Sequence, residues 1–347
     1  MINKEKIEIK SAHEIEKSLL FDFYKQAYPA KYMSMVENWS WQNRCDFIAD
    51  RVPLVAVYEN KAIAHAGMIP FSIYNEKIKN SASWFIDFKV LDAFQGMGVG
   101  SLLTKEWMKI TDVFFAAPCN DMSMGVFKKH SWLEYKESFM HLCFVRPFDY
   151  PVFQKKLPES IRKLLNRLSF LYFKHYYRLN SLPENDCTIS KLSVEIFNEF
   201  YNQYQGNKFT NADCLSVLRD ESFYQWRVFA SPNYNRYYLF KHDSFSAVFS
   251  LHDLQNKFID VLWCSDTADK NEIMTMISTL SLHYRDISHI RFYTNRKEVS
   301  DFLQKRIKSI VRYPKLAFCL NNCESENNEN AFTFDFELID NDFEHIS

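Results

Sequence analysis

The spacing of apolar residues predicts alternating strands and helices in the N-terminal part of the chain. Residues 81–90 (SASWFIDFKV) combine aromatic and β-branched side chains, which favours a strand. In residues 101–112 the apolar positions recur at helical spacing. Residues 112–121 (DVFFAAPCND) again indicate a strand. The pattern in this region is therefore strand, loop, helix and strand.

Residues 146–182 show a different pattern, in which apolar and basic positions alternate. A serine near the start of this run is a typical helix cap, so we expect one long helix here. The basic residues expected on its outward face are Arg162, Lys163, Arg167, Lys174 and Arg178. Such a helix either bridges two domains and buries its aromatic residues, or lies on an anionic membrane surface. The sequence favours the bridge.

The loop between the first strand and the first helix concentrates glycine. The chain has 6 glycines, and Gly96, Gly98 and Gly100 all lie in FQGMGVGSLL, residues 94–103. Glycine permits αL conformations, and a helix N-terminus offers unpaired N–H groups to an oxyanion. The loop lacks the lysine of a Walker motif and the GxGxxG spacing of a dinucleotide loop. It predicts a phosphate site; the alternative is a turn that only closes a strand onto a helix.

The pattern Q/R-x-x-G-x-G/A at residues 95–100 resembles the acyl-CoA pyrophosphate loop of the GCN5-related N-acetyltransferase (GNAT) superfamily. Its flanks are similar to that family's fourth strand and third helix. The resemblance implies an α/β fold, with a mixed, mostly antiparallel sheet flanked by helices, and acyl-CoA as co-substrate. It also implies that the backbone of Val90 pairs with pantetheine. The implied pyrophosphate contacts are Gln95, Gly96, Met97, Gly98, Val99, Gly100 and Ser101.

The next segment, residues 120–132, is similar to the family motif N..A..lYeklGF. Asn120 falls on the motif's asparagine, which implies a contact to the cofactor. Two positions depart from the motif, because its tyrosine is Phe127 here and its glycine is Ser131. A tyrosine at that position therefore cannot protonate the CoA thiolate. A thiolate with a pKa of about 8.5 leaves without much help, so the loss is tolerable.

The C-terminal half contains a degenerate copy of the same pattern. Residues 258–267 (FIDVLWCSDT) align with residues 85–94 (FIDFKVLDAF), which places Asp260 on Asp87. Continued without a gap, the alignment puts Asp269 in the phosphate loop, where a carboxylate would repel pyrophosphate. We therefore expect the second copy to shape the acceptor site, with one active site between the copies. The expected domains are residues 1–145 (acyl-CoA-binding GNAT domain), 146–189 (helical linker) and 190–347 (degenerate GNAT-like domain).

Residues 221–238 (ESFYQWRVFASPNYNRYY) resemble a segment of tandem GNAT proteins from bacterial surface-polysaccharide pathways, including those of lipopolysaccharide O-antigen. Residues 332–344 resemble the C-terminal ending of the same proteins. Some of these acylate the amino group of a nucleotide-linked sugar, such as a dTDP-3-amino-3,6-dideoxyhexose. Aromatic rings and a guanidinium suit a sugar diphosphate. The candidate acceptor contacts are Trp226, Arg227, Tyr234, Asp260 and Trp263. The alternative for Trp226 and Arg227 is a core tryptophan beside a structural arginine.

Two residues are candidates for the catalytic base. Asp87 lies three residues before Val90 on the predicted central strand, at a depth where the family often places an acid. Its alternative is a buried carboxylate paired with Lys89 or a backbone amide. His65 lies in AIAHAGMIP, which we expect to be the neighbouring strand, and its alternative is a core histidine with satisfied hydrogen bonds. A weak base or a water chain suffices for a modestly basic sugar amine.

Composition narrows the class of protein further. The net charge of −1 provides no global field that would gather nucleic acid or anionic lipid, so any polyanion must be held by local groups. The 8 cysteines are scattered without a CxxC pair, so no metal site is expected. The N-terminus lacks the apolar core of a signal peptide, and no run reaches the roughly 18–20 apolar residues of a membrane span. We expect a reduced, cytoplasmic protein that is a monomer or a homodimer.

The expected function is acyl-CoA-dependent N-acylation of a nucleotide-linked amino sugar, by direct attack in a ternary complex. Acetyl-CoA and 3-hydroxybutyryl-CoA are both candidate donors, because the loop reads pyrophosphate and not acyl length. Two alternatives come from other classes. One is a protein or peptide N-acyltransferase, and the other is a non-catalytic module that binds acyl-CoA as a sensor.

Overall fold

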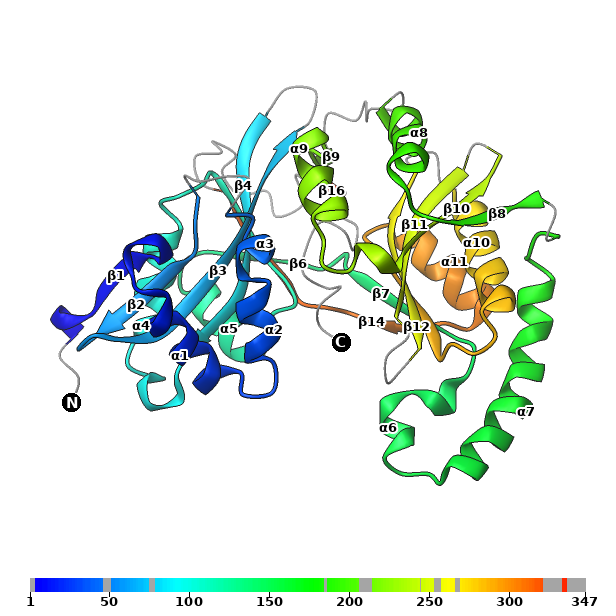
Figure 1. Ribbon diagram of the computed structural model, residues 1–347, viewed down its shortest axis with the longest axis horizontal. Helices are drawn as coiled ribbons and strands as arrows, with labels where there is room; N and C mark the ends of the chain where they lie inside the picture. Colours follow the sequence, from blue (N-terminus) through cyan, green and yellow to red (C-terminus); the bar gives the residue numbers. More distant parts are fainter. Residues whose placement is uncertain are drawn as a thin grey trace. The chain divides into compact units, whose positions relative to one another are not determined.

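The computed structural model describes residues 4–45, 51–74, 79–183, 186–205, 214–243, 245–252, 257–265, 269–320 and 333–335 of the chain. These residues form two compact units, each assembled from separate segments. The first unit comprises Met1–Lys136, Asn211–Pro232 and Lys315–Asp335, and the second comprises Glu137–Thr210, Asn233–Pro314 and Phe336–Ser347. Each unit has its own sheet, and Figure 1 shows both.

The sheet of the first unit runs in the order β1-β2-β3-β4-β5-β15-β6, and β9 joins β3 to β16. Its strands are β1 (Glu8–Ser11), β2 (Leu54–Tyr58), β3 (Lys61–Tyr74), β4 (Lys79–Val90), β5 (Val113–Ala116), β6 (Leu133–Tyr135), β9 (Cys214–Val217), β15 (Leu316–Leu320) and β16 (Thr333–Asp335). Its helices are α1 (Lys17–Ala27), α2 (Tyr32–Glu37), α3 (Trp39–Gln42), α4 (Val99–Trp107), α5 (Asp121–Lys128) and α9 (Glu221–Tyr224). Among the described strands of the main path, the pair β4–β5 is parallel and the other pairs are antiparallel.

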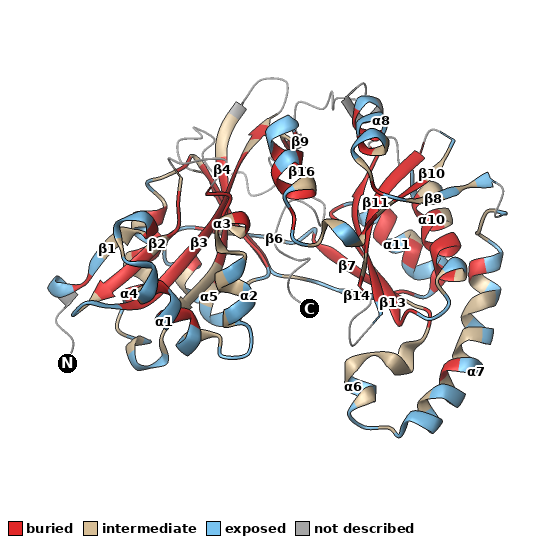
Figure 2. Cartoon of the chain, viewed as in Figure 1, coloured by how far each residue is buried: buried red, intermediate tan, exposed pale blue. Residues whose placement is uncertain are grey.

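Alternation along the strands divides the helices of the first unit between two faces. Val55 and Val57 of β2 pack with α1, whereas Ala56 between them packs with α4 and α5. This is the period of two that a strand imposes on its side chains. Figure 2 shows the buried positions concentrated in the central strands. Both faces of this sheet are therefore covered, which leaves the strand ends and edges for a ligand.

The sheet of the second unit runs in the order β14-β7-β13-β12-β11-β10-β8, and its one parallel pair among the described strands is β12–β13. Its strands are β7 (Phe139–Phe144), β8 (Thr188–Lys191), β10 (Tyr237–His242), β11 (Phe245–His252), β12 (Phe258–Cys264), β13 (His289–Thr294) and β14 (Ile310–Arg312). Its helices are α6 (Pro151–Gln154), α7 (Glu159–Arg178), α8 (Val194–Gln205), α10 (Lys270–His283) and α11 (Lys297–Ile307). Helices α7, α10 and α11 contact one another over the core.

The predicted fold class is confirmed, because both units are mixed, mostly antiparallel sheets flanked by helices. The two units repeat the order antiparallel strand pair, helix, parallel strand, as β3-β4-α4-β5 and β11-β12-α10-β13. The predicted strand at residues 81–90 lies within β4. The predicted helix at residues 101–112 overlaps α4, which begins two residues earlier and ends at Trp107.

The chain exchanges strands between the two sheets. Strand β7 follows β6 directly in sequence but pairs with β13 and β14 of the second sheet. Strand β15 returns from the C-terminal half and lies between β5 and β6 in the first. The units are therefore discontinuous, whereas the sequence analysis expected continuous domains at residues 1–145 and 190–347. Strand pairing between distant segments is not encoded in local periodicity, so the boundary fell after β7 instead of before it.

Candidate functional site

Strand β4 has an edge that its parallel neighbour leaves uncovered. It pairs with β3 from Tyr74↔Lys79 to Ala64↔Val90, along its whole length. Within the described residues it pairs with β5 at Ala82–Trp84 and not beyond. The two parallel strands therefore diverge after Trp84, and the last residues of β4 present backbone groups on the side away from β3.

The hydrogen bonds at the end of β4 show which backbone groups point away from β3. The N–H of Leu91 donates to Ile63 O on β3, at 2.9 Å. Successive backbone groups of a strand point to opposite sides, so Val90 directs its N–H and C=O away from β3. The carbonyl of Val90 accepts from Gln95 Nε2 at 3.0 Å. The predicted backbone contact at Val90 thus lies on the open edge, with its carbonyl already held by the predicted loop residue Gln95.

The glycine loop leads from this edge into the first turn of α4. Gly96 and Gly98 have φ of +74° and +84°, a conformation that L side chains rarely adopt. Gly98 is the N-cap residue of α4 and offers no side chain to cap it. The first bond of the helix runs from Leu102 N to Gly98 O, at 3.0 Å. The N–H groups of Val99, Gly100 and Ser101 therefore precede the hydrogen-bond ladder, at the positive end of the helix dipole.

The other predicted loop residues have separate reasons for their identity. A Cβ on Gly100 would lie 3.1 Å from Phe88 Cζ, so Gly100 allows α4 to pack closely on β4. Val99 is buried and Met97 is partly buried in the core, which leaves their backbone for any ligand. The hydroxyl of Ser101 is bonded to His130 Nε2, at 2.6 Å. The predicted loop residues are thus together in space, and what they offer is mainly main chain.

Asn120 begins the neighbouring helix α5 and caps it. Its Oδ1 accepts from Ser123 N at 2.8 Å, and Ser123 Oγ accepts in return from Asn120 N at 3.0 Å. This reciprocal capping box satisfies two N–H groups that a ligand could otherwise bind. The departing motif position Phe127 is buried and stacks on Trp132, with 4.5 Å between ring centroids. The structure therefore gives Asn120 a capping role and Phe127 a core role.

Asp87 lies at a break in the pairing of β3 with β4. The register changes between Gly67↔Ile86 and His65↔Lys89, so Asp87 and Phe88 oppose a single residue. Asp87 has φ of +45°, which is uncommon for a residue other than glycine and recurs at functional sites. Lys89, the partner considered from the sequence, pairs instead with Asp92 at 3.0 Å.

The carboxylate of Asp87 is poised to titrate near neutrality. Burial raises its pKa to about 6, although the charge of Lys31 and a hydrogen bond from Gln42 work in the opposite direction. Gln42 Nε2 donates to Asp87 Oδ2 at 2.8 Å, so the side chain is also oriented. A base with a pKa near the operating pH transfers protons efficiently.

His65 lies behind Asp87 and not beside its carboxylate. The imidazole is fully buried, and burial lowers its pKa to about 4, so it is neutral at pH 7. Its Nδ1 lies 3.4 Å from the carbonyl oxygen of Asp87, and its Nε2 lies 3.1 Å from the hydroxyl of Tyr24. Trp39 Nε1 donates in turn to that hydroxyl, at 3.1 Å. These four residues form a chain of hydrogen bonds that ends on the backbone of Asp87.

Trp226 and Arg227 belong to the first unit and are buried there. They lie in the π-helical turn Gln225–Phe229. Trp226 Nε1 donates to the carbonyl of Trp41 at 2.6 Å, and Trp41 Nε1 donates to the carbonyl of Trp226 at 2.9 Å. Arg227 lies over the ring of Trp41, at 5.1 Å from its centroid. Both side chains therefore fasten residues 221–232 to the segment around Trp41.

Residues 39–44 (WSWQNR) carry much of this site, and sequence reasoning assigned them nothing. Trp39 and Gln42 reach the group around Asp87. Arg44 is buried, donates to Pro70 O at 2.8 Å and lies over the ring of Trp226 at 4.9 Å from its centroid. The signal available in the sequence was this short run, in which two tryptophans and a glutamine are followed closely by an arginine.

The remaining acceptor candidates lie in the second unit. Tyr234 is half-buried and donates to Leu192 O at 3.1 Å. Trp263 is buried against Phe200, with 5.0 Å between ring centroids. Asp260 is also buried, and Arg291 binds both of its oxygens at 2.5 Å. Burial alone would raise the pKa of Asp260, but the charge and hydrogen bonds of Arg291, with those of His252, hold it below the usual value.

Among the described residues, no group of three or more His, Cys, Asp and Glu side chains is placed to hold a metal ion. None of the described helices combines the length and apolar character that a membrane span requires.

No protein-family model matches the sequence, and no curated protein matches it either. Solved structures do match. A GCN5-related N-acetyltransferase from Kribbella flavida has a TM-score of 0.58 at 11% identity, covering 92% of this chain and 72% of that one. A GCN5-related N-acetyltransferase from Anabaena variabilis has a TM-score of 0.57 at 9% identity, covering 90% and 72%. Saccharomyces cerevisiae N-myristoyltransferase with bound myristoyl-CoA has a TM-score of 0.55 at 10% identity, covering 95% and 82%.

These similarities extend over both units of the chain. At such low identity they show the fold and nothing about individual residues. The chain has the α/β fold of the GCN5-related N-acetyltransferases, in a tandem arrangement.

Proposed function

We propose that the protein is an acyl-CoA-dependent N-acyltransferase with its donor site in the first unit. The observation that carries the proposal is the uncovered edge of β4 leading directly into the uncapped first turn of α4. An extended amide-containing chain can pair with a strand edge, and an anion can bind helix N–H groups. Pantetheine and pyrophosphate are joined in this order in CoA, so one ligand satisfies both features.

The described residues fit this ligand. Val90 offers an N–H to pantetheine, and the N–H groups of residues 96–101 offer donors to pyrophosphate. Gly96 and Gly98 carry no Cβ and have positive φ, which other residues rarely adopt, so their main chain stays open to a ligand. Arg and Lys side chains are not needed for such contacts, because the dipole and N–H groups of α4 favour negative charge.

The reaction that this site supports is direct transfer. The nitrogen of a neutral amine attacks the thioester carbonyl, the C–N bond forms, the C–S bond breaks and CoA leaves as thiolate. Asp87 accepts the proton that the amine loses, directly or through water, because its raised pKa suits a base. A backbone N–H on the open edge of β4 stabilises the charge that develops on the carbonyl oxygen.

His65 acts in this proposal by position and not by proton transfer. Its lowered pKa keeps it neutral, and its ring faces the carbonyl of Asp87 instead of the carboxylate. The hydrogen bonds from Trp39 through Tyr24 and His65 hold the unusual backbone of Asp87 in place. Catalytic geometry within a fraction of an ångström depends on supports of this kind.

We further propose that the acceptor is the amino group of a nucleotide-linked sugar. The support is the sequence pattern at residues 221–238, which resembles tandem enzymes of surface-polysaccharide pathways. Because Trp226 and Arg227 are buried, they order this segment, and the sugar contacts come from more exposed residues. A cytoplasmic location belongs to this proposal.

A protein or peptide amine is the second candidate acceptor. The observation that favours it is the match to an N-myristoyltransferase over 95% of this chain. That enzyme was solved with bound myristoyl-CoA, so a long acyl donor belongs in the test as well.

The test is a thiol-release assay combined with calorimetric CoA binding. Acetyl-CoA, 3-hydroxybutyryl-CoA and myristoyl-CoA are each offered to nucleotide-linked amino sugars, peptides and polyamines. We expect turnover with one class of amine and loss of both turnover and CoA binding in Gly98→Asp. The matched control is Gly125→Asp, because Gly125 is exposed on α5 and a Cβ there meets nothing within 4 Å.

The outcomes separate the candidates. Acylation of a sugar nucleotide supports the full proposal, whereas acylation of peptides alone moves the second candidate first. CoA binding without acylation of any amine contradicts the enzyme proposal and favours a sensor. Failure to bind CoA overturns the donor site itself.

A further inference from the structure

Helix α7 of the second unit has three faces with different chemistry. At about 100° per residue, positions four, seven and eleven apart share a face. The face toward α10 and α11 is buried or partly buried and consists of Asn166, Phe170, Phe173 and Tyr177. This face explains why the helix packs on the unit. It leaves most of the helix circumference facing outward.

The second face is apolar and exposed. We call it the α7 stripe, and it consists of Ile161, Leu164, Leu168, Leu171, Tyr172 and Leu179. The exposed fractions of Leu164, Leu168 and Leu171 are 58%, 57% and 64%. Their spacing of three and four residues places them on one side of the helix, over an arc of about 100°. A continuous exposed row of leucines marks an interaction surface on a protein outside a membrane.

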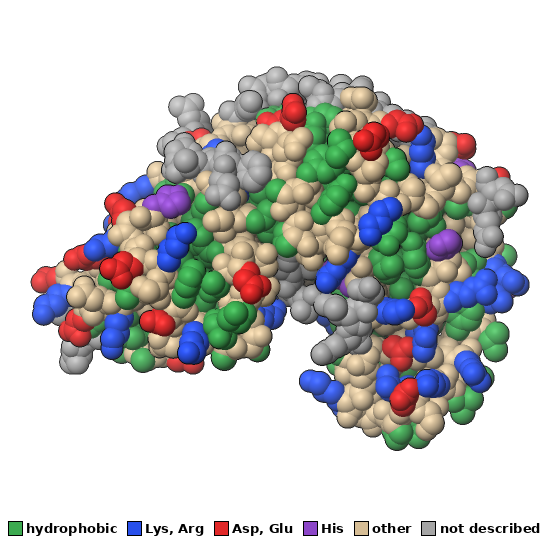
Figure 3. Space-filling model, viewed as in Figure 1, with side chains coloured by type: hydrophobic (Ala, Val, Ile, Leu, Met, Phe, Trp, Pro, Cys, Tyr) green, Lys and Arg blue, Asp and Glu red, His purple; other side chains and the backbone are tan. Residues whose placement is uncertain are grey.

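The third face is basic and lies between the buried face and the stripe. Lys163, Arg167, Lys174 and Arg178 follow one another at intervals of four and seven residues, so they form one row along the helix. We call this row the basic edge. Residues 151–178 contain seven Lys and Arg but only one acid, Glu159. The full chain, by contrast, has a net charge of −1. Figure 3 shows apolar and basic side chains together in the region of α6 and α7.

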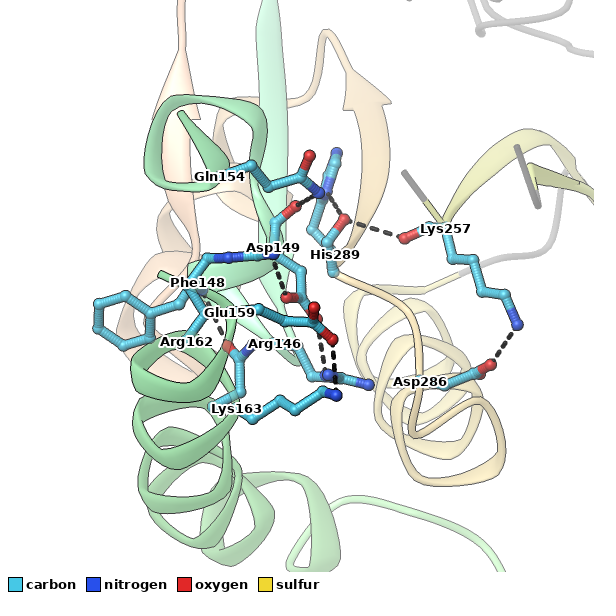
Figure 4. A network of polar contacts seen from close by, with 12 residues as sticks. Arg146, Phe148, Asp149, Gln154, Glu159, Arg162, Lys163, Lys257, Asp286 and His289 are labelled. Atoms are coloured by element: carbon cyan, nitrogen blue, oxygen red, sulfur yellow. Dashed lines mark hydrogen bonds and ion pairs between the residues drawn. The ribbon is translucent and has the colours of Figure 1, made fainter. Parts of the chain in front are cut away.

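The helix is held so that the stripe stays outward. Arg146 and Arg162 both bind Asp149, at 2.8 and 3.1 Å. Asn166 Oδ1 accepts from Phe148 N at 2.9 Å, and Tyr177 donates to Phe144 O at 2.5 Å. Figure 4 shows the network around Asp149, which includes Arg162 and the ion pair of Lys163 with Glu159. The contacts fix both halves of α7 from its buried side, so the stripe is not free to turn inward.

We propose that the α7 stripe and the basic edge dock the protein on an anionic lipid surface. Apolar side chains would enter the boundary of headgroups and acyl chains, and the adjacent cations would meet lipid phosphates. The charge pattern selects this partner, because acids are scarce along the same helix. A second copy would offer no acidic row to the basic edge, because Glu159 is the one acid in residues 151–178. In an antiparallel pair the two basic edges would also repel each other.

This inference goes beyond the acylation reaction and does not depend on it. It places the enzyme beside a membrane without a span, as an interfacial helix does. The bridge between domains expected from the sequence does not describe α7, because the helix lies wholly within the second unit and buries its aromatic residues there.

The test is flotation of the full-length protein with vesicles. We expect binding at low salt to phosphatidylcholine vesicles with about 30% phosphatidylserine, and at least tenfold weaker binding to pure phosphatidylcholine. Binding should fall as salt rises, because the charges are exposed. The variant Arg167→Gln/Lys174→Gln/Arg178→Gln and the variant Leu164→Ser/Leu168→Ser/Leu171→Ser should each weaken binding at least about tenfold.

A matched variant removes three exposed lysines from the first unit: Lys6→Gln/Lys17→Gln/Lys25→Gln. It carries the same change of net charge and should bind as the wild type does. Circular dichroism checks that each variant is folded. The proposal is overturned if the wild type ignores anionic vesicles, or if this control loses binding as the α7 variant does. A dimer in sedimentation that the leucine variant dissociates, without vesicle binding, assigns the stripe to a second copy instead.

Discussion

Helices α4 and α10 each follow a central strand of their sheet, but only α10 of these two has a side-chain cap on its first turn. Gly98 precedes α4 in the αL conformation and gives it no side-chain cap. Asp269 precedes α10, and its carboxylate accepts from Asn271 N at 2.7 Å and Glu272 N at 2.8 Å. Glu272 completes a capping box by accepting from Asp269 N. One helix start is satisfied within the chain, and the other keeps donors for an anion.

The two aspartates on the central strands also differ in whether a partner within the chain holds their charge. Asp87 lies at the bulge of β4, keeps a pKa near 6 and has Gln42 as its oriented partner. Asp260 lies two residues before the bulge of β12, faces Arg291 in the parallel register and is locked in its ionised form. The gap-free alignment paired these two residues, but the bulges show that they occupy different places on their strands.

The comparison teaches how one strand–helix unit serves two purposes. In the second unit Asp269 and Asp260 both have internal partners, which stabilises the fold. In the first unit comparable groups keep capacity for a ligand, at the cost of local stability. The same substitution should therefore affect stability in one unit and activity in the other.

The largest effect is expected from Arg291→Met. It leaves the buried carboxylate of Asp260 without its cation, which costs about 3–5 kcal/mol of unfolding free energy. Urea unfolding measures this loss. The wild-type pair lowers the pKa of Asp260, so its contribution is complete above the unfolded value and is lost as pH falls. The loss in Arg291→Met should therefore shrink toward pH 3. The exposed Arg285→Met serves as control, within about 0.5 kcal/mol of wild type.

The next effect is that of Gly98→Asp on the donor site. A carboxylate and a strained αL residue at the start of α4 should lower kcat/KM at least about a hundredfold, which corresponds to about 2.7 kcal/mol. Thiol release and CoA calorimetry measure it together. An unchanged CoA affinity in this variant would remove the glycine loop from the site.

Asp87→Asn should act on turnover and leave CoA binding intact. Asparagine tolerates the αL backbone and retains the contact to Gln42, but it cannot take a proton. We expect a loss of about a hundredfold in kcat. The wild-type rate should rise as pH passes about 6, where the carboxylate forms, and the variant should lack this step.

The same variant, Asp87→Asn, should gain stability although it loses activity. A raised carboxyl pKa means that the folded state favours protonation, so the wild type loses stability as pH rises from about 4 to 6. Asp87→Asn lacks this loss. Its Tm should exceed that of the wild type at pH 8 by more than at pH 4. The same Tm difference at both pH values would indicate that Asp87 does not titrate in this range.

The smallest effect is expected from Asp269→Ala, which removes the cap of α10. It should cost about 1 kcal/mol of stability without affecting CoA affinity. Equilibrium unfolding measures the first quantity, and calorimetry the second. A clear loss of CoA binding would show that the start of α10 serves a ligand after all, and the contrast between the two helices would fail.

Local sequence predicted the strand, loop and helix of the donor site because each depends on neighbouring residues. The period of β4, the glycines at 96 and 98 and the helical spacing of α4 are all short-range signals. The sequence also marked Asp87, although it did not reveal the positive φ or the partner Gln42. The pattern of residues 332–344 lies outside the described residues, apart from β16.

The remainder depends on contacts between segments far apart in sequence. Trp226 resembled an acceptor contact until Trp41, far earlier in the chain, accounted for its N–H and its burial. Likewise, the sequence did not reveal that Arg227 lies over the ring of Trp41. Aromatic and guanidinium groups serve cores and ligand sites equally well, so their type alone does not decide between the two roles.

The exchange of β7 and β15 has a consequence for synthesis on the ribosome. The first sheet needs β15 between β5 and β6, and that strand ends at Leu320. The chain as far as Leu320 must therefore leave the exit tunnel before the first unit can close its sheet. Until then β5 offers an unpaired edge to other nascent chains. An N-terminal fragment ending at Lys136 would keep that edge permanently, so this part of the chain is not a self-sufficient module.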